Sequence, residues 1–334
     1  MQLSILNEIP DGLLDCGADE LHQYLPGPCL INLQGKKDEV LFVSILMHGN
    51  EYTGWEAVRK LLKNYQDTVL PKSLSLFIGN IHAARGGARL LAGQEDYNRI
   101  WKQPSAEGDY AFAKQLLNEL NKINPMMAVD IHNNTGLNPH YACVNKLEKD
   151  YLYLATLFSR TVVYFTHPDS VLSLALSEYC PAVTVECGKP DDAAGVEHAL
   201  NFLQACLHLD HFPSHSIAEQ DVDVFHTVAT VYVNKEVSIG FGMEQADLCF
   251  ISELDTLNFN ELEEGTLLAN AGKEIDVPFD VQNEAGVNVS NEYFVNKNGR
   301  IVTTVPIMPS MLTLKRDIIK QDCLCYLMER YPLS

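Results

Sequence analysis

Positive charge is scarce in this sequence, and no apolar run is long enough to cross a membrane. The chain has 24 Lys and Arg residues against 44 Asp and Glu residues, so its formal net charge is −20. A surface this acidic repels nucleic-acid phosphates and anionic lipids, which argues against nucleic acid and membrane as partners. The first basic residue is Lys36, so the amino-terminal stretch lacks the basic region of a signal peptide. We therefore expect a cytoplasmic protein.

Paired cysteine motifs are missing as well. The nine Cys residues, an odd number, include no C-x-x-C pair, so buried reduced thiols explain them better than a disulfide framework does. Hydrophobic residues make up 46% and charged residues 20% of the chain, the profile of a globular protein. A chain of 334 residues is longer than one core commonly fills, so we expect two domains.

Strand-like and helix-like patterns alternate over the first two thirds of the chain. Short apolar β-rich runs predict strands at residues 39–46, 74–78, 126–131, 162–165 and 182–185. Apolar residues at helical spacing predict helices at residues 51–65, 110–123, 151–158, 172–179 and 196–209. The alternation predicts an α/β fold with a mixed, mostly parallel sheet and helices on both faces.

The pattern changes near Pro213. Short strands separated by turn residues are expected at residues 222–233, 246–251, 266–269 and 293–307, the last around an N-K-N-G turn. We therefore predict one domain at residues 1–213 and a smaller β-rich C-terminal domain at residues 214–334.

Three polar motifs directly follow three of the predicted strands. They are M-H-G-N-E at residues 47–51, H-N-N-T-G at residues 132–136 and E-C-G at residues 186–188. The carboxyl ends of parallel strands share one edge of a sheet, and ligands bind there. We therefore expect these distant motifs to converge on one site.

The first two motifs contain the ligands that a catalytic zinc ion needs. Zinc takes about three ligands from His, Asp, Glu or Cys and keeps a position open for water. His48 and Glu51 are three residues apart, Gly49 permits a tight turn between them, and His132 offers a third ligand. A lone H-x-x-E pair is weak evidence, but several motifs at strand ends favour one metal ion per chain. Other divalent metals fit similar sites.

Carboxylates close to these ligands have two interpretations each. Asp130 either orients His132 or bonds the backbone. Glu186 ends an apolar run, where a carboxylate is costly unless it is paired or functional. It would act as general base, or it would pair with Lys189 or a helix N-terminus. Cys187 alternates to the other strand face and is not expected to be a ligand.

Arginines gather between residues 85 and 99. Guanidinium groups bind carboxylates bidentately and stabilise oxyanions. For Arg85, surface pairing with Glu95 or Asp96 is the favoured interpretation.

In order, the motifs H-G-N-E, G-N-x-x-A, an Arg, N-R, D-I-H-N and T-V-E-x-G span roughly residues 40–200. This set resembles the succinylglutamate desuccinylase/aspartoacylase family of the zinc carboxypeptidase superfamily. The resemblance implies a zinc carboxypeptidase-like first domain that hydrolyses an amide bond. It also implies that the β-rich domain partly caps the active site.

The resemblance gives individual residues their roles. Zinc would be bound by His48, Glu51 and His132. Glu186 would be the general base and later the proton donor, and Arg89 would polarise the scissile carbonyl. Substrate-binding roles would fall to Asn98 and Arg99, which grip a carboxylate, and to His140 and Tyr293.

The favoured function is that of an N-acyl amino acid amidohydrolase acting on a small, carboxylate-bearing substrate. A metallocarboxypeptidase that cleaves short peptides uses the same atoms and stays an alternative, as does a degenerate member that binds without hydrolysis. Residues 134–138 have no Arg where the desuccinylase pattern has one, which argues against N-succinylglutamate. The acyl group, the amine, the Arg that polarises the carbonyl and the formation of a homo-oligomer stay open.

Overall fold

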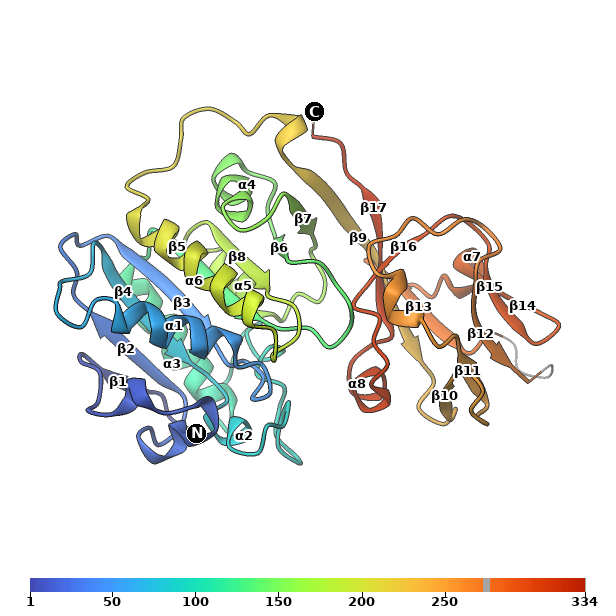
Figure 1. Ribbon diagram of the computed structural model, residues 1–334, viewed down its shortest axis with the longest axis horizontal. Coiled ribbons are helices and arrows are strands. Elements are labelled where there is room, and N and C mark those ends of the chain that lie inside the picture. The colour runs from blue at the N-terminus through green and yellow to red at the C-terminus, as the bar shows by residue number, and fades with distance from the viewer. Residues whose placement is uncertain (273–276, 334) are drawn as a thin grey trace. The chain divides into compact units, whose positions relative to one another are not determined.

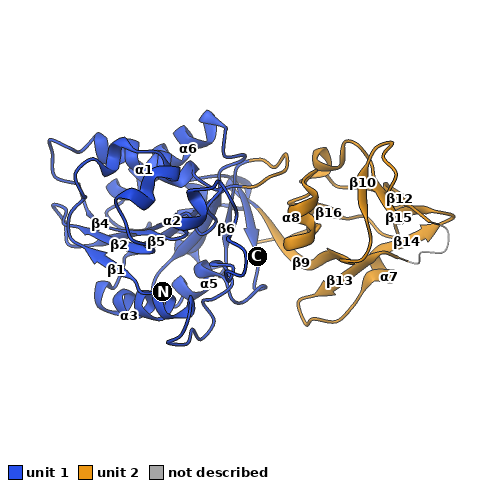
Figure 2. Cartoon of the chain, turned by 90° about the horizontal axis from the view of Figure 1, so that it is seen from below, with its two compact units in different colours: residues 1–133, 140–223 blue, residues 134–139, 224–334 orange. Residues whose placement is uncertain are grey.

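The predicted alternation of strands and helices is present in the first of two units that the computed structural model contains (Figures 1 and 2). The structure describes residues 1–272 and 277–333. The first unit comprises residues 1–133 and 140–223, and the second comprises residues 134–139 and 224–334. The division into domains at residues 213 and 214 stays a prediction.

A mixed, mostly parallel sheet forms the centre of the first unit, in the order β1-β2-β4-β3-β5-β8-β6-β7. Its neighbours β4, β3, β5 and β8 run parallel, whereas β2 and β6 are antiparallel to β4 and β8. The strands are β1 (Ser4–Leu6), β2 (Cys29–Leu33), β3 (Val40–Ile45), β4 (Ser73–Ile78), β5 (Met127–His132), β6 (Tyr141–Val144), β7 (Thr161–Tyr164) and β8 (Ala182–Glu186).

Helices cover both faces of this sheet, as the sequence predicted. Figure 2 shows α1 and α6 on one side of the strands and α3 and α5 on the other. The helices are α1 (Thr53–Lys63), α2 (Ile81–Ala84), α3 (Tyr110–Ile123), α4 (Lys149–Thr156), α5 (Leu172–Leu176) and α6 (Ala193–His208), with short 3-10 turns at Leu13–Asp15, Ala18–Gln23 and Glu219–Asp221. The α3 and α5 side packs as an aromatic-rich core that includes Phe77, Trp101 and Phe112.

Local sequence signals explain where the longer helices begin and end. In α1 the buried positions include Trp55, Val58, Leu61 and Leu62, so the apolar stripe expected from the spacing faces the sheet. α3 ends at Ile123, and the next residue, Asn124, adopts a left-handed conformation (φ 47°) just before a proline. Among the predicted elements of this unit the differences lie at the ends, for example α5, which stops at Leu176, three residues early, whereas β1, β2 and β6 were not predicted.

The second unit is β-rich and contains two sheets. One sheet is built on the long strand β9 (Asp223–Val233), which pairs with β13 (Phe279–Asn283) and β17 (Cys325–Arg330), and β17 pairs with β16 (Met308–Ser310). The other has the order β10 (Ile239–Phe241), β11 (Leu248–Phe250), β12 (Leu267–Ala271), β15 (Arg300–Thr303) and β14 (Phe294–Lys297). The remaining elements are α7 (Ser290–Tyr293), α8 (Arg316–Gln321) and a 3-10 turn at Leu254–Leu257.

Side chains from both sheets share one apolar core in this unit, for example Val231 with Phe250 and Ile301. The N-K-N-G segment forms the predicted turn between β14 and β15, where Asn298 and Gly299 both have positive φ.

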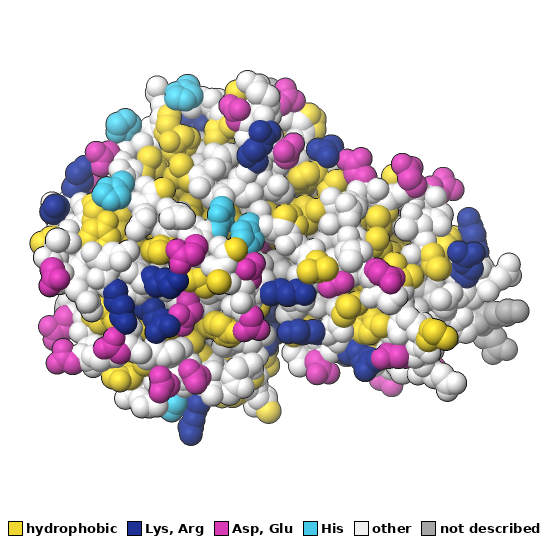
Figure 3. Space-filling view, viewed as in Figure 1, with side chains coloured by type: hydrophobic (Ala, Val, Ile, Leu, Met, Phe, Trp, Pro, Cys, Tyr) yellow, Lys and Arg dark blue, Asp and Glu magenta, His cyan; other side chains and the backbone are white. Residues whose placement is uncertain are grey.

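Most charged side chains lie on the surface and the thiols lie in the core, as is usual for a globular protein. Acidic side chains are spread over the face shown in Figure 3, with basic side chains beside many of them. Ion pairs in the first unit include Lys60 with Glu197 and Lys63 with Asp15. All nine Cys residues lie in the described part of the chain, and each is a buried free thiol. Within the described residues, no helix combines the length and apolar character that a bilayer span requires.

Candidate metal centre

The carboxyl ends of β3, β5 and β8 lie side by side at one edge of the first unit's sheet. β3 pairs in parallel with β5, and β5 with β8, so that His132 stands directly opposite Glu186. The segment after β3 carries His48 and Glu51 over this edge before α1 begins. The sheet topology therefore brings together the three motifs that the sequence separates, as expected for parallel strands.

Three buried side chains meet there in an arrangement that fits a metal ion. Glu51 Oε1 lies 2.8 Å from His48 Nδ1, and Glu51 Oε2 lies 2.8 Å from His132 Nδ1. One ligand atom from each of these residues lies within 4.8 Å of the others, and all three side chains are buried. Two imidazoles and one carboxylate are a donor set that zinc prefers.

In both imidazoles, the nitrogen that faces away from Glu51 contacts another carboxylate. His132 Nε2 lies 2.9 Å from Asp130 Oδ2, and His48 Nε2 lies 3.0 Å from Asp96 Oδ1. These contacts fix the ring orientation, so each His presents Nδ1 to the common centre. Asp130 therefore contacts His132, the first of the two alternatives that its position in the sequence left open.

Asp96 is the member of this group that the sequence analysis did not assign to the metal centre. Arg89 Nη2 lies 3.3 Å from Asp96 Oδ2, and the backbone N–H of Asn98 donates to Asp96 Oδ1 at 2.8 Å. Burial raises the pKa of Asp96, but His48 and Arg89 outweigh it and hold that pKa well below its ordinary value. No local pattern in the sequence indicated its contact with His48, which is 48 residues away.

A close backbone contact positions the loop that carries His48. The N–H of Gly49 donates to the carbonyl of Arg89 at 3.0 Å. A Cβ atom at Gly49 would lie only 2.3 Å from the backbone nitrogen of Ala84, so any other residue would push the loop away from α2. The glycine between the two predicted ligands is therefore required by packing against α2.

Glu186 is buried at the end of β8, beside the three-residue group. In the described part of the chain, its Oε2 atom has no hydrogen-bond partner. Burial raises the pKa of Glu186 to about 7, and the negative charge of Glu51 adds to this while His132 opposes it. A buried carboxyl with a free oxygen and a pKa near neutrality can exchange a proton with a bound water or substrate.

Arg89 lies against the same group. Its Nη1 atom is 3.6 Å from Glu51 Oε1, and its side chain is 12% exposed. Asn98 and Arg99 follow Asp96 directly: Asn98 Oδ1 accepts the N–H of Leu172 at 3.1 Å, and Arg99 Nη1 donates to the carbonyl of Asn98 at 3.0 Å. Arg85 is exposed.

His140 and Tyr293, the two remaining predicted residues, lie in different units. His140 stacks near His198 with ring centroids 5.0 Å apart, and a Cβ at Gly188 would lie 3.2 Å from its Nε2 atom. Tyr293 is in the second unit, at the end of α7, where it packs against that unit's core. The substrate-binding roles of both residues stay predictions.

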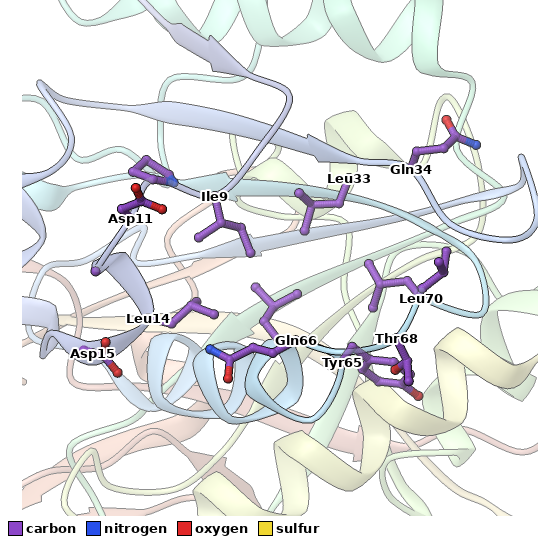
Figure 4. Close-up of a pocket in the computed structure, with 14 residues that line it drawn as sticks. Ile9, Asp11, Leu14, Asp15, Leu33, Gln34, Tyr65, Gln66, Thr68 and Leu70 are labelled. Atoms are coloured by element: carbon purple, nitrogen blue, oxygen red, sulfur yellow. The ribbon is translucent and has the colours of Figure 1, made fainter.

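A cavity of about 530 Å³ in the first unit lies away from the metal centre (Figure 4). Leu33 at the end of β2, Tyr65 after α1 and Leu70 before β4 line it. These positions are at the amino-terminal end of β4, whereas His48 follows the carboxyl end of its parallel neighbour β3. None of the predicted site residues lines this cavity.

Comparison with known proteins agrees with this geometry. A family model described as the succinylglutamate desuccinylase/aspartoacylase catalytic domain matches residues 39–210. These residues include the three candidate ligands, Glu186 and the Arg89–Arg99 segment. The comparison with curated proteins found no match.

Solved structures with the same fold cover most of the chain. A succinylglutamate desuccinylase from Chromobacterium violaceum is 16% identical, with a TM-score of 0.58 over 90% of this chain and 87% of that chain. A succinylglutamate desuccinylase/aspartoacylase from Rhodobacter sphaeroides is 12% identical, with a TM-score of 0.59 over 90% and 88%. Murine aminoacylase 3 is 14% identical, with a TM-score of 0.55 over 89% and 97%.

Identities this low establish the shared fold, and the family model, which matches more than half of the chain, establishes the relationship. The chain belongs to the succinylglutamate desuccinylase/aspartoacylase family.

Proposed function

We propose that the protein is a zinc-dependent amidohydrolase that removes the acyl group from a small, carboxylate-bearing N-acyl amino acid. The observation that carries this proposal is the juxtaposition of two ordered imidazoles, one carboxylate and the free Oε2 atom of Glu186 at one sheet edge. The family relationship supports the same reaction class.

His48, Glu51 and His132 would hold the zinc ion through two Nδ1 atoms and the Glu51 carboxylate. The donor set fits this metal, and Asp96 and Asp130 fix both rings in the required orientation. When bound, zinc supplies a Lewis acid that lowers the pKa of a water and polarises a carbonyl.

Glu186 would move the protons of the reaction. Its Oε2 atom takes a proton from the attacking water and later gives it to the nitrogen of the departing amine, so one carboxyl serves as base and then as acid. A pKa of about 7 suits both directions near neutral pH. The lack of a competing hydrogen bond at Oε2 among the described residues leaves that atom available.

Positively charged groups would orient the substrate and stabilise the developing oxyanion. Arg89 would donate to the scissile carbonyl oxygen, and its contact with the candidate ligand Glu51 supports this role. Arg99 would bind the substrate carboxylate together with Asn98, whose Oδ1 is occupied by Leu172 and whose Nδ2 can donate. Fixing the carboxylate in this way would orient the amide for attack.

Metal analysis and a substrate panel on one purified sample test this proposal. We expect about one zinc ion per chain, as the single group of three ligands among the described residues implies. We also expect hydrolysis of N-acetyl or N-succinyl amino acids that a chelator abolishes and added zinc restores. Preferential cleavage of dipeptides would favour the carboxypeptidase alternative, and metal binding without any hydrolysis would favour a degenerate member.

A further inference from the structure

Asn133 follows the candidate ligand His132, and its buried side-chain amide joins segments that are distant in the chain. Its Oδ1 atom accepts the backbone N–H of Thr53 at 3.2 Å. Its Nδ2 group donates to Thr53 Oγ1 and to the carbonyl of Gly188, both at 2.9 Å. The backbone N–H of Asn133 donates to Glu51 Oε2 at 3.3 Å. One residue therefore connects β5, the start of α1 and the segment after β8.

The segment after β8 matters because it directly follows Glu186, the last residue of that strand. The sheet ladder ends one residue later, where the N–H of Cys187 donates to the carbonyl of His132 at 3.0 Å. The chain then turns at Gly188, whose φ of +72° is a conformation that other residues rarely adopt. The hydrogen bond from Asn133 Nδ2 to the Gly188 carbonyl is made at this turn, two residues beyond Glu186.

We propose that Asn133 is a positioning residue that fixes the distance between Glu186 and the three metal ligands. It bonds the first residue of the helix that follows Glu51, and it bonds the turn that follows Glu186, so both are held to a common point. This inference rests on the proposed function. Displacements of about 1 Å at a reacting group can lower turnover about 100-fold, so a loosened turn would affect the chemical step.

Metal binding would depend less on this contact. The ligand atoms of His48, Glu51 and His132 lie on β5 and on the loop between β3 and α1, and none of them is in the segment after β8. The bond from the backbone N–H of Asn133 to Glu51 survives any change of the Asn133 side chain. Loss of the Asn133 side-chain amide should therefore lower turnover and leave the zinc content unchanged.

Asn133→Asp in the full-length, zinc-loaded protein tests the proposal. Asp keeps the volume and the acceptor for Thr53, but it places a carboxylate oxygen against the Gly188 carbonyl. We expect kcat to fall about 30- to 100-fold, whereas KM and zinc content stay within about threefold. A residue that only stabilised the fold would lower the folded fraction, so zinc content would fall in proportion to apparent kcat and the turnover per bound zinc would stay unchanged.

Asn145→Asp is the matched control. Asn145 is also buried in the first unit, and its Nδ2 group donates to the carbonyl of Phe165 at 3.0 Å. The same chemical change therefore removes the same kind of bond outside the segments that carry the ligands and Glu186. We expect kcat of this variant to stay within about threefold of the unaltered protein.

A second readout uses metal-free protein and requires no activity. Within residues 187–192, the N–H groups of Cys187 and Asp192 donate to the carbonyls of His132 and Lys189, and their hydrogen exchange should become about tenfold faster in Asn133→Asp and stay unchanged in Asn145→Asp. If Asn133→Asp does not fold, Asn133→Ala with Asn145→Ala as control provides the same comparison without an added charge. Unchanged kcat, unchanged exchange at residues 187–192, or loss of zinc together with activity would each overturn the positioning role.

The two proposals can fail separately. If the unaltered protein hydrolyses no N-acyl amino acid, the proposed function is wrong, and the exchange experiment still decides whether Asn133 holds the turn after Glu186. If the unaltered protein is active and Asn133→Asp retains its kcat, only the positioning role is wrong.

Discussion

The candidate metal centre has a strand side and a loop side that are built differently. The strand side comprises Asp130 and His132 on β5 and Glu186 on β8, and the side chains of Asp130 and His132 are only 1% and 5% exposed. The loop side comprises His48, Arg89 and Asp96, and the Asp96 side chain is 21% exposed. Both sides use a carboxylate to hold an imidazole, but in different surroundings.

This difference shows two ways of making a site rigid. On the strand side, the sheet register alone places His132 opposite Glu186, and Asp130 is two residues from His132 on the same strand. On the loop side, His48 and Asp96 are 48 residues apart, and their contact depends on side chains and on the packing of Gly49 against α2. We therefore expect substitutions on the strand side to have the larger effects.

The largest effect is expected for Glu186→Gln on the strand side. Gln is isosteric and cannot exchange a proton, so kcat should fall about 10³-fold while zinc content is unchanged. Steady-state kinetics with metal analysis on the same sample checks this. Turnover within tenfold of the unaltered protein would show that another group moves the proton, and the strand side would then contribute no catalytic base.

The same substitution should stabilise the metal-free protein at neutral pH. The pKa of Glu186 is raised from its ordinary value of 4.5 to about 7 in the fold. Between these values the folded state binds more protons than the unfolded state, so the free energy of unfolding falls as pH rises from 4.5 to 7. Gln removes this penalty, which is about 3 kcal/mol above pH 7 and small near pH 4.5.

Urea unfolding of the metal-free Glu186→Gln variant and the unaltered protein at pH 5 and pH 8 measures this effect. The stability gain should be much larger at pH 8. An equal gain at both pH values would mean that the buried carboxyl carries no charge penalty, and its proposed role as a base poised near neutrality would be wrong.

The next largest effect is expected for Asp130→Asn, which should weaken metal binding. Asp130 is buried on β5 and no solvent can replace its charge beside His132, so we expect the zinc dissociation constant to rise about 10- to 100-fold. Competition with a chromophoric chelator measures the constant. A change below threefold would show that the strand itself, without the carboxylate, is enough to orient His132.

The strand side was largely predictable from the sequence, because period and spacing are local signals. The apolar runs that became β3, β5 and β8 each end at a polar motif, and parallel order follows from the helices between them. Three other strands of this sheet were not predicted: β1 has only three residues, and β2 and β6 run antiparallel to β4 and β8 without a local signal for that direction. Their place depends on long-range pairing.

The loop side was predictable only in part. His48 and Glu51 stand three residues apart, a spacing that lets them share one metal ion but that is weak evidence without the other motifs. Asp96 lies in an irregular segment whose residues follow no helical or strand period, so nothing local indicated its contact with His48. The same holds for Asn133, whose partners Thr53 and Gly188 are 80 and 55 residues away. Side-chain contacts of this range require coordinates.

Asp96→Asn, on the loop side, is expected to have the smallest effect on metal binding. The Asp96 side chain is partly exposed, so water can replace one of its contacts, and Asn retains an oxygen that can accept a hydrogen bond from His48 Nε2. We expect the zinc dissociation constant to rise about threefold to tenfold, less than for Asp130→Asn in the same chelator assay. Because Arg89 also loses the carboxylate of Asp96, while its contact with Glu51 remains, kcat should fall more than metal affinity does. A larger loss of zinc affinity for Asp96→Asn than for Asp130→Asn would reverse the ranking, and would mean that the side-chain cross-link, rather than the sheet, determines how rigidly this centre is held.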